Sequence, residues 1–142
     1  MIRDATGEDI PALLDMGERF AEKARTAEHI GYDRESVGIT LAHLIDSPDG
    51  IVLITEARDG AIGGLCHPHP FNLKVKVGQE LFWWSEGPHG LALLEALEVK
   101  AKELGAALWT MIALETIRPE VTGRLYQWRG YRPLEHSFIK EL

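Results

Sequence analysis

Residues 80–105, ELFWWSEGPHGLALLEALEVKAKELG, decide the fold of this chain. They begin with the aromatic-rich stretch 80–85, which predicts a strand buried on both faces. A glycine-containing turn at residues 86–90 leads directly into residues 91–104, whose leucines and alanines recur at helical spacing until Gly105 ends the helix. Residues 106–114 predict another buried strand, so this part of the chain forms a right-handed strand–helix–strand unit.

The residues before this unit predict one strand, two helices and a hairpin. A short strand is expected at residues 1–5, and Thr6 with Asp9 has the pattern of a capping box that opens a helix extending to Ala24. A second amphipathic helix is expected around residues 37–45. Residues 51–55 and 61–67 predict two strands joined by a turn at residues 58–60, and a loop is expected at residues 68–79.

The residues after the unit predict a helix and further strand. Pro119 opens a last helix that Gly130 ends. Residues 131–142 predict two short strands or one bent strand. Together these elements predict a single domain spanning residues 1–142, an α/β fold or α+β sandwich around a mixed central sheet.

Composition excludes several classes of function. The 142 residues carry a formal net charge of -7, which disfavours binding to nucleic acid and suits a cationic amine. Cys66 is the only cysteine, so no intrachain disulfide can form, and the N-terminus does not have the pattern of a signal peptide. No apolar stretch is long enough to span a membrane. We therefore expect a cytoplasmic protein that binds neither nucleic acid nor membrane.

The turn at residues 86–90 is the first candidate for a binding site. A helix N-terminus presents free N–H groups and the positive end of the helix dipole, which together bind anions. Gly87 and Gly90 allow a phosphate to approach the backbone closely, and residues 90–93 would supply consecutive amides. A plain tight turn before a helix is the alternative interpretation of the same glycines.

These features resemble the GNAT acetyltransferases over nearly the whole chain. Residues 87–92, Gly-Pro-His-Gly-Leu-Ala, stand where that family has its pyrophosphate loop. Gly90 and Ala92 match the loop signature, whereas Gly87 stands where the family usually has Gln or Arg. Residues 125–131, Leu-Tyr-Gln-Trp-Arg-Gly-Tyr, are similar to the family's C-terminal signature Leu-Tyr-x-x-x-Gly-Phe/Tyr. The adjacent tryptophans at 83 and 84 resemble GNAT proteins that phages and prophages often encode.

The resemblance implies a fold and an activity. The fold would have about six to seven strands and about four helices. The activity would be N-acetyl transfer from acetyl-CoA to a primary amine by direct attack, with Tyr126 as the general acid. The amine could be a small molecule or a peptide, and the family's habit of dimerising makes a homodimer possible. The residues implied in acetyl-CoA binding are Trp84, Ser85, Gly87, His89, Gly90, Leu91, Ala92 and Leu93.

A base for the amine is the least determined part of the site. Glu86 and Glu115 are candidates because each follows a predicted strand next to the site, and Glu80 is a third. The alternative for each is a solvated carboxylate at a strand end. His67 and His69 could share one face of a strand, but no third ligand is recognisable nearby, so no metal is expected and a place in the acceptor pocket is favoured.

Two other classes of function fit the same sequence. The missing basic residue at position 87 would suit a catalytically silent acyl-CoA-binding or regulatory module. An interaction protein, phage-associated and without a cofactor, is the second alternative. Tyr126, Gly90 and Ala92 favour the enzyme.

Overall fold

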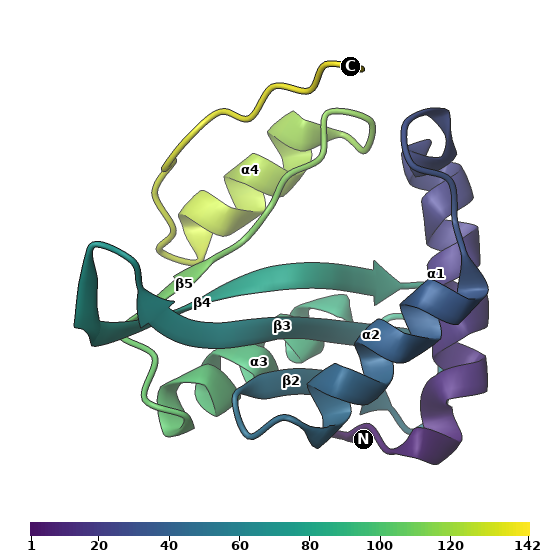
Figure 1. Ribbon diagram of the computed structural model, residues 1–142, viewed down its shortest axis with the longest axis horizontal. Coiled ribbons are helices and arrows are strands. Elements are labelled where there is room, and N and C mark those ends of the chain that lie inside the picture. Colours follow the sequence, from purple (N-terminus) through teal and green to yellow (C-terminus); the bar gives the residue numbers. More distant parts are fainter.

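The computed structural model describes residues 1–142, except for the side chain of Ala27. One five-stranded sheet has the order β1-β2-β3-β4-β5 (Figure 1). Its strands are β1 (Ile2–Asp4), β2 (Gly50–Thr55), β3 (Gly60–His69), β4 (Asn72–Ser85) and β5 (Leu108–Thr110). Strands β1 to β4 are antiparallel neighbours, and β5 is parallel to β4. The helices are α1 (Ile10–Ala24), α2 (Arg34–Asp46), α3 (Gly90–Glu103) and α4 (Pro119–Trp128).

The sheet is covered on both faces, because alternate side chains of a strand point to opposite sides. Val52 and Ile54 of β2 belong to a core shared with α1 and α2. Ile51 and Leu53, their neighbours in sequence, belong to a second core shared with α3. Figure 1 shows α1 and α2 in front of the sheet and α3 behind it. Within the described residues, no helix combines the length and apolar character that crossing a membrane requires.

The hairpin of β3 and β4 is longer than the sequence predicts. The prediction of a loop at residues 68–79 is wrong, because β3 continues to His69 and β4 begins at Asn72. Residues 73–77, Leu-Lys-Val-Lys-Val, alternate apolar and charged side chains, which is the pattern of a strand with one exposed face. Pro68 lies near the exposed end of the hairpin, where a missing N–H costs little pairing.

The expectation of six to seven strands is also wrong. The sheet has five, and residues 131–142 form no strand. The predicted buried strand at residues 106–114 shortens to three residues, and Leu108 within it is 63% exposed. The lower strand count and the exposure of β5 go together. Residues 131–142 add no strand to the outer edge of β5, so β5 pairs with β4 alone. Apolar side chains such as that of Phe138 stay exposed.

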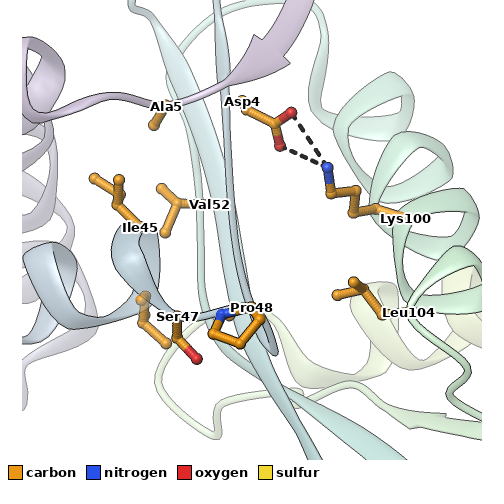
Figure 2. A pocket seen from close by; sticks show the side chains of 10 residues that line it. Asp4, Ala5, Ile45, Ser47, Pro48, Val52, Lys100 and Leu104 are labelled. Carbon is orange, nitrogen blue, oxygen red and sulfur yellow. Dashed lines mark hydrogen bonds and ion pairs between the residues drawn. The ribbon is translucent and has the colours of Figure 1, made fainter.

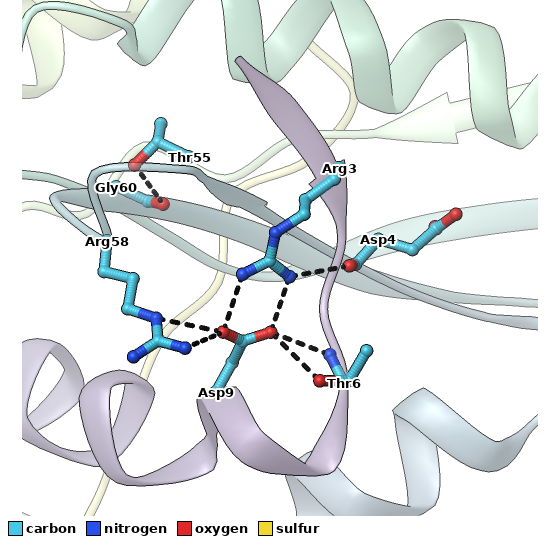
Figure 3. A network of polar contacts seen from close by, with 7 residues as sticks. All are labelled: Arg3, Asp4, Thr6, Asp9, Thr55, Arg58 and Gly60. Atoms are coloured by element: carbon cyan, nitrogen blue, oxygen red, sulfur yellow. Dashed lines mark hydrogen bonds and ion pairs between the residues drawn. The ribbon is translucent and has the colours of Figure 1, made fainter.

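The start of α1 is fixed by a buried carboxylate (Figure 3). Asp9 is fully buried and accepts two hydrogen bonds from the Arg3 guanidinium, at 2.7 and 2.9 Å. It also accepts the Thr6 backbone N–H at 2.9 Å, as the capping box predicted, and a bond of 3.1 Å from Arg58 Nε. These bonds, led by the one from Arg3, hold the pKa of Asp9 far below its usual range. Asp9 therefore joins β1, α1 and the turn between β2 and β3.

We predict that Asp9→Asn lowers the free energy of unfolding by about 2–3 kcal/mol at pH 7, because it leaves two guanidinium groups without their buried partner. Since the pKa of Asp9 is lowered in the folded state, this stabilisation is present above pH 4 and is lost as the pH falls below it. Urea unfolding at pH 7 and pH 3 measures both effects. Asp15→Asn, which removes a solvent-exposed pair with Arg34, is the control and should change little. Equal stability of Asp9→Asn and wild type at pH 7 would contradict this account.

Candidate functional site

The candidate site lies where β5 separates from β4. The two strands pair only from Val77–Leu108 to Gln79–Thr110, and no pairing follows. At this point the pairing of β4 with β3 is also irregular, since Gly63 lies opposite Phe82 while Gly64 lies opposite Glu80. Leu81 is therefore the extra residue of a β-bulge. The bulge and the separation of the strands coincide at residues 80–81.

Glu80 lies where the two segments separate, a place called the opening below, and its side chain bonds across it. Its side chain is 7% exposed, and its Oε1 accepts the backbone N–H of Ile112 at 2.9 Å. Burial raises the pKa of Glu80 to about 7, against the opposing effect of the hydrogen bond from Ile112. The carboxyl group is consequently able to gain or lose a proton near neutral pH.

Tyr126 of α4 bonds to the same residue, Ile112. Its hydroxyl donates to the carbonyl oxygen of Ile112 at 2.7 Å, and the residue is 7% exposed. Its ring stacks on Trp83, with 6.2 Å between ring centroids. Burial raises the pKa of Tyr126 well above its ordinary value, and the charge of Glu80 adds to this effect. Glu80 and Tyr126 thus meet at Ile112, one at its N–H and the other at its C=O.

Hydrogen bonds on both sides of helix α4 hold it in place and so position Tyr126. Arg129, just after the helix, donates to Glu95 and Glu98 of α3 at 3.2 and 2.8 Å. Before the helix, the Thr116 hydroxyl donates to the carbonyl oxygen of Ala24 at the end of α1, at 2.7 Å. Figure 1 shows α4 lying over the edge of the sheet that β4 and β5 form.

The loop from β4 to α3 presents backbone donors beside this opening. The first backbone hydrogen bond of α3 runs from Leu93 N to His89 O at 3.0 Å. The N–H groups of residues 90–92 come before it and therefore have no acceptor within the helix. Trp83 links the loop to the rest of the site, since a Cβ on Gly90 would lie 3.9 Å from its ring and the same ring stacks on Tyr126. The free helix N-terminus and the Glu80–Tyr126 pair are therefore neighbours.

Some residues implied in cofactor binding hold the loop in place instead of facing outward. The Trp84 side chain lies in the core, stacked on Phe82 with centroids 4.1 Å apart. Leu93 is fully buried and its amide belongs to α3. The backbone N–H of Gly87 donates to Asp59 O at 2.9 Å. The remaining residues of the predicted set, Ser85, His89, Gly90, Leu91 and Ala92, line the turn and the first turn of α3.

The carboxylates proposed as bases have different surroundings. Glu86 accepts two bonds from the Arg19 guanidinium of α1, at 2.6 and 2.8 Å, and this contact lowers its pKa. Glu115 is exposed in the turn before α4. Only Glu80, the third candidate, is buried in the opening between the strands. Burial is what raises the pKa of Glu80, and burial of a carboxylate at the end of a paired region could not be read from the sequence.

The histidines of the long hairpin make local contacts. His67 Nδ1 lies 2.9 Å from the carbonyl oxygen of Pro68, and His69 Nδ1 accepts the backbone N–H of Phe71 at 3.0 Å. Among the described residues, no group of three or more His, Cys, Asp or Glu side chains is arranged to hold a metal ion.

A separate hollow of about 260 Å³ lies beside β1 and β2 (Figure 2). Lys100 of α3 and Asp4 of β1 pair across its rim, with Nζ and Oδ1 3.1 Å apart. Leu44 and Val52 provide apolar lining. Because β3 and β4 separate this hollow from β5 in the strand order, it is not part of the candidate site.

Comparison with known proteins identifies the fold. No protein-family model matches the sequence, and no curated protein does. Solved structures match over the whole chain. The ribosomal-protein-alanine N-acetyltransferase from Brucella melitensis biovar Abortus has a TM-score of 0.70 and 16% identity, covering 100% of this chain and 98% of that chain. A GCN5-related N-acetyltransferase from Ralstonia eutropha has a TM-score of 0.73 and 18% identity, covering 99% and 97%.

A transcriptional regulator from Bacillus halodurans is also similar, with a TM-score of 0.77 and 14% identity, covering 100% of this chain and 99% of that chain. These likenesses establish that the chain has the fold of the GNAT acetyltransferases, as the resemblance in the sequence predicted. At such identities they describe the fold, and the activity has to be argued from the site.

We predict that Glu80→Gln makes the protein more stable above pH 7 than wild type. Because the pKa of Glu80 rises from 4.5 to about 7 on folding, its contribution to stability is fully present below pH 4.5 and is lost as the pH rises through 7. The shift corresponds to about 3 kcal/mol, and glutamine can still accept the Ile112 N–H without carrying a charge. Urea unfolding of both proteins between pH 4.5 and 8 measures the difference, and a difference independent of pH would contradict the burial of a titrating carboxyl.

Proposed function

We propose that this protein transfers an acetyl group from acetyl-CoA to an amine, with the chemistry at the opening between β4 and the segment after β5. The observation that carries the proposal is the meeting of Glu80 and Tyr126 at Ile112, beside the free N-terminus of α3. One group that titrates near neutral pH and one that stays protonated are what proton transfer from an amine and to a thiolate requires.

The backbone amides of residues 90–92 suit the pyrophosphate of acetyl-CoA. They lie before the first intrahelical bond of α3, where the helix dipole is positive. Gly90 packs closely against Ser85, since a Cβ there would lie 2.8 Å from Ser85 Oγ. The loop sequence itself has no Lys or Arg, so the attraction would come from N–H groups and His89.

Glu80 is the base in this proposal. An amine attacks only as the neutral species, and a buried carboxylate with a pKa of about 7 can accept the proton that the ammonium form must lose. Glu86 is less suited to the role, because Arg19 holds its carboxylate and lowers its pKa. Glu115 is exposed, which favours solvation over catalysis.

Tyr126 is the acid. With its pKa raised above the ordinary value, the phenol is protonated at neutral pH, so the tyrosine has a proton to give and does not act as a base. Attack of the amine forms the C–N bond, the C–S bond breaks, and the departing sulfur takes the hydroxyl proton of Tyr126. The ammonium form loses two protons in all. The one lost before attack goes to Glu80 and on to solvent, and the one lost after attack goes through solvent to the tyrosine. The acceptor would be a small-molecule or peptide amine, to which the net charge of -7 is favourable.

Isothermal titration of acetyl-CoA and of free CoA into the purified protein tests the binding half of the proposal. We expect Gly90→Glu to weaken binding about tenfold or more, because it places a carboxylate among the amides that receive the phosphates. Gly90→Ala introduces the same Cβ without the charge and should weaken binding less. Val99→Glu adds the same charge further along α3, at a residue that is 60% exposed, and should bind as wild type does.

Turnover of acetyl-CoA with a panel of small amines and peptides tests the catalytic half. Tyr126→Phe should leave the Kd for CoA unchanged and lower kcat, by about 10²-fold or more, since only the proton donor is lost. Absence of CoA binding by the wild type would overturn the proposal in favour of a protein without this cofactor. Binding without any turnover would favour a silent acyl-CoA-binding module.

A further inference from the structure

The turn between β2 and β3 is built against the loop that is proposed to receive the pyrophosphate. The backbone carbonyl of Asp59 accepts the N–H groups of Glu86 and Gly87, at 2.8 and 2.9 Å. Pro88 has no N–H, and the carbonyl of Gly87 accepts a bond from the Ser85 hydroxyl at 3.3 Å. The backbone N–H groups of Glu86 and Gly87 are therefore bonded within the protein, whereas the amides of residues 90–92 precede the first intrahelical bond of α3.

Asp59 itself is held by Thr55. The Thr55 hydroxyl donates to Asp59 Oδ1 at 2.7 Å and accepts the Asp59 backbone N–H at 3.1 Å. Thr55 is buried, so both contacts are shielded from water. Arg58, the residue before Asp59, also holds the turn. It has a positive φ of 58°, and its side chain bonds to Asp9 (Figure 3). The turn is thereby fixed on both sides of the Asp59 carbonyl.

The Asp59 carboxylate also explains the residue at position 87. A Cβ built on Gly87 would collide with the Oδ2, Cγ and Oδ1 atoms of Asp59. Gly87 has no positive φ, so its backbone conformation does not demand glycine. The reason for glycine is the neighbouring carboxylate, which Thr55 prevents from turning aside.

Resting on the function proposed above, we infer that Asp59 is a positioning residue for the pyrophosphate loop and that it requires glycine at position 87. Through its carbonyl it fixes residues 86 and 87, and through its pinned carboxylate it excludes any side chain there. The loop is thus set to bind phosphate by the amides of α3, without the basic side chain that position 87 could otherwise carry.

A double-mutant cycle tests this inference by titration of CoA into wild type, Asp59→Ala, Gly87→Ala and the double variant. We expect Gly87→Ala to weaken CoA binding about tenfold in the wild-type background and to have almost no effect when Asp59 is already alanine, because the colliding atoms are gone. Asp59→Asn keeps an acceptor for Thr55 and removes the charge near the phosphates, so it should bind CoA at least as tightly as wild type.

Acetylpantetheine, which has the thioester but no phosphate, is the control ligand. Its affinity should be the same in all variants, because the inference concerns the phosphate loop only; circular dichroism confirms that each variant is folded. If wild type binds CoA and Gly87→Ala weakens binding by the same factor in both backgrounds, the role of Asp59 is overturned while the proposed function stands. If wild type binds no CoA, the proposed function falls and this inference falls with it.

Discussion

The pairing of β4 with β5 stops after Gln79 and Thr110, and the candidate site depends on that separation. A parallel strand that continued to pair would use the N–H and C=O of Ile112 within the sheet. Instead these two groups are free to bond to Glu80 and Tyr126. The bulge at Leu81 and the attachment of α4 to α3 through Arg129 keep the two segments apart and the two side chains in place.

Two buried carboxylates, Asp9 and Glu80, differ in the donors that surround them. Asp9 is fully buried but surrounded by donors from Arg3 and Arg58, so it remains ionised and supports the fold. Glu80 is nearly as buried but has a single backbone donor, so desolvation dominates and its pKa rises to about 7. A buried carboxylate therefore supports stability at one side of the sheet and, in the proposed function, accepts a proton at the other.

The sequence predicted the parts of this structure that depend on local patterns. The capping box at Thr6, which opens a 3-10 turn at Gly7–Asp9 just before α1, the helix start at Pro119 and the stop at Gly130 were readable, because capping and φ preferences act within a few residues. Glu80 was only the third candidate for a base, since its burial depends on where β5 leaves β4. Asp59 was visible only as a turn residue, because its contact with Gly87 joins two loops that lie far apart in the sequence. The strands expected at 131–142 failed because local apolar patterns do not supply a pairing partner.

The most direct test of the account is a ¹⁵N NMR titration with acetyl-CoA that follows backbone amides and tryptophan indoles. Trp83 Nε1 is buried without a hydrogen-bond partner among the described residues and lies between Gly90 and Tyr126, whereas Trp128 is 73% exposed. The account predicts that the Trp83 indole and the amides of residues 90–92 and 112 shift together, while the Trp128 indole does not. Shifts confined to the hollow beside β1 and β2, or no shifts at all, would contradict it.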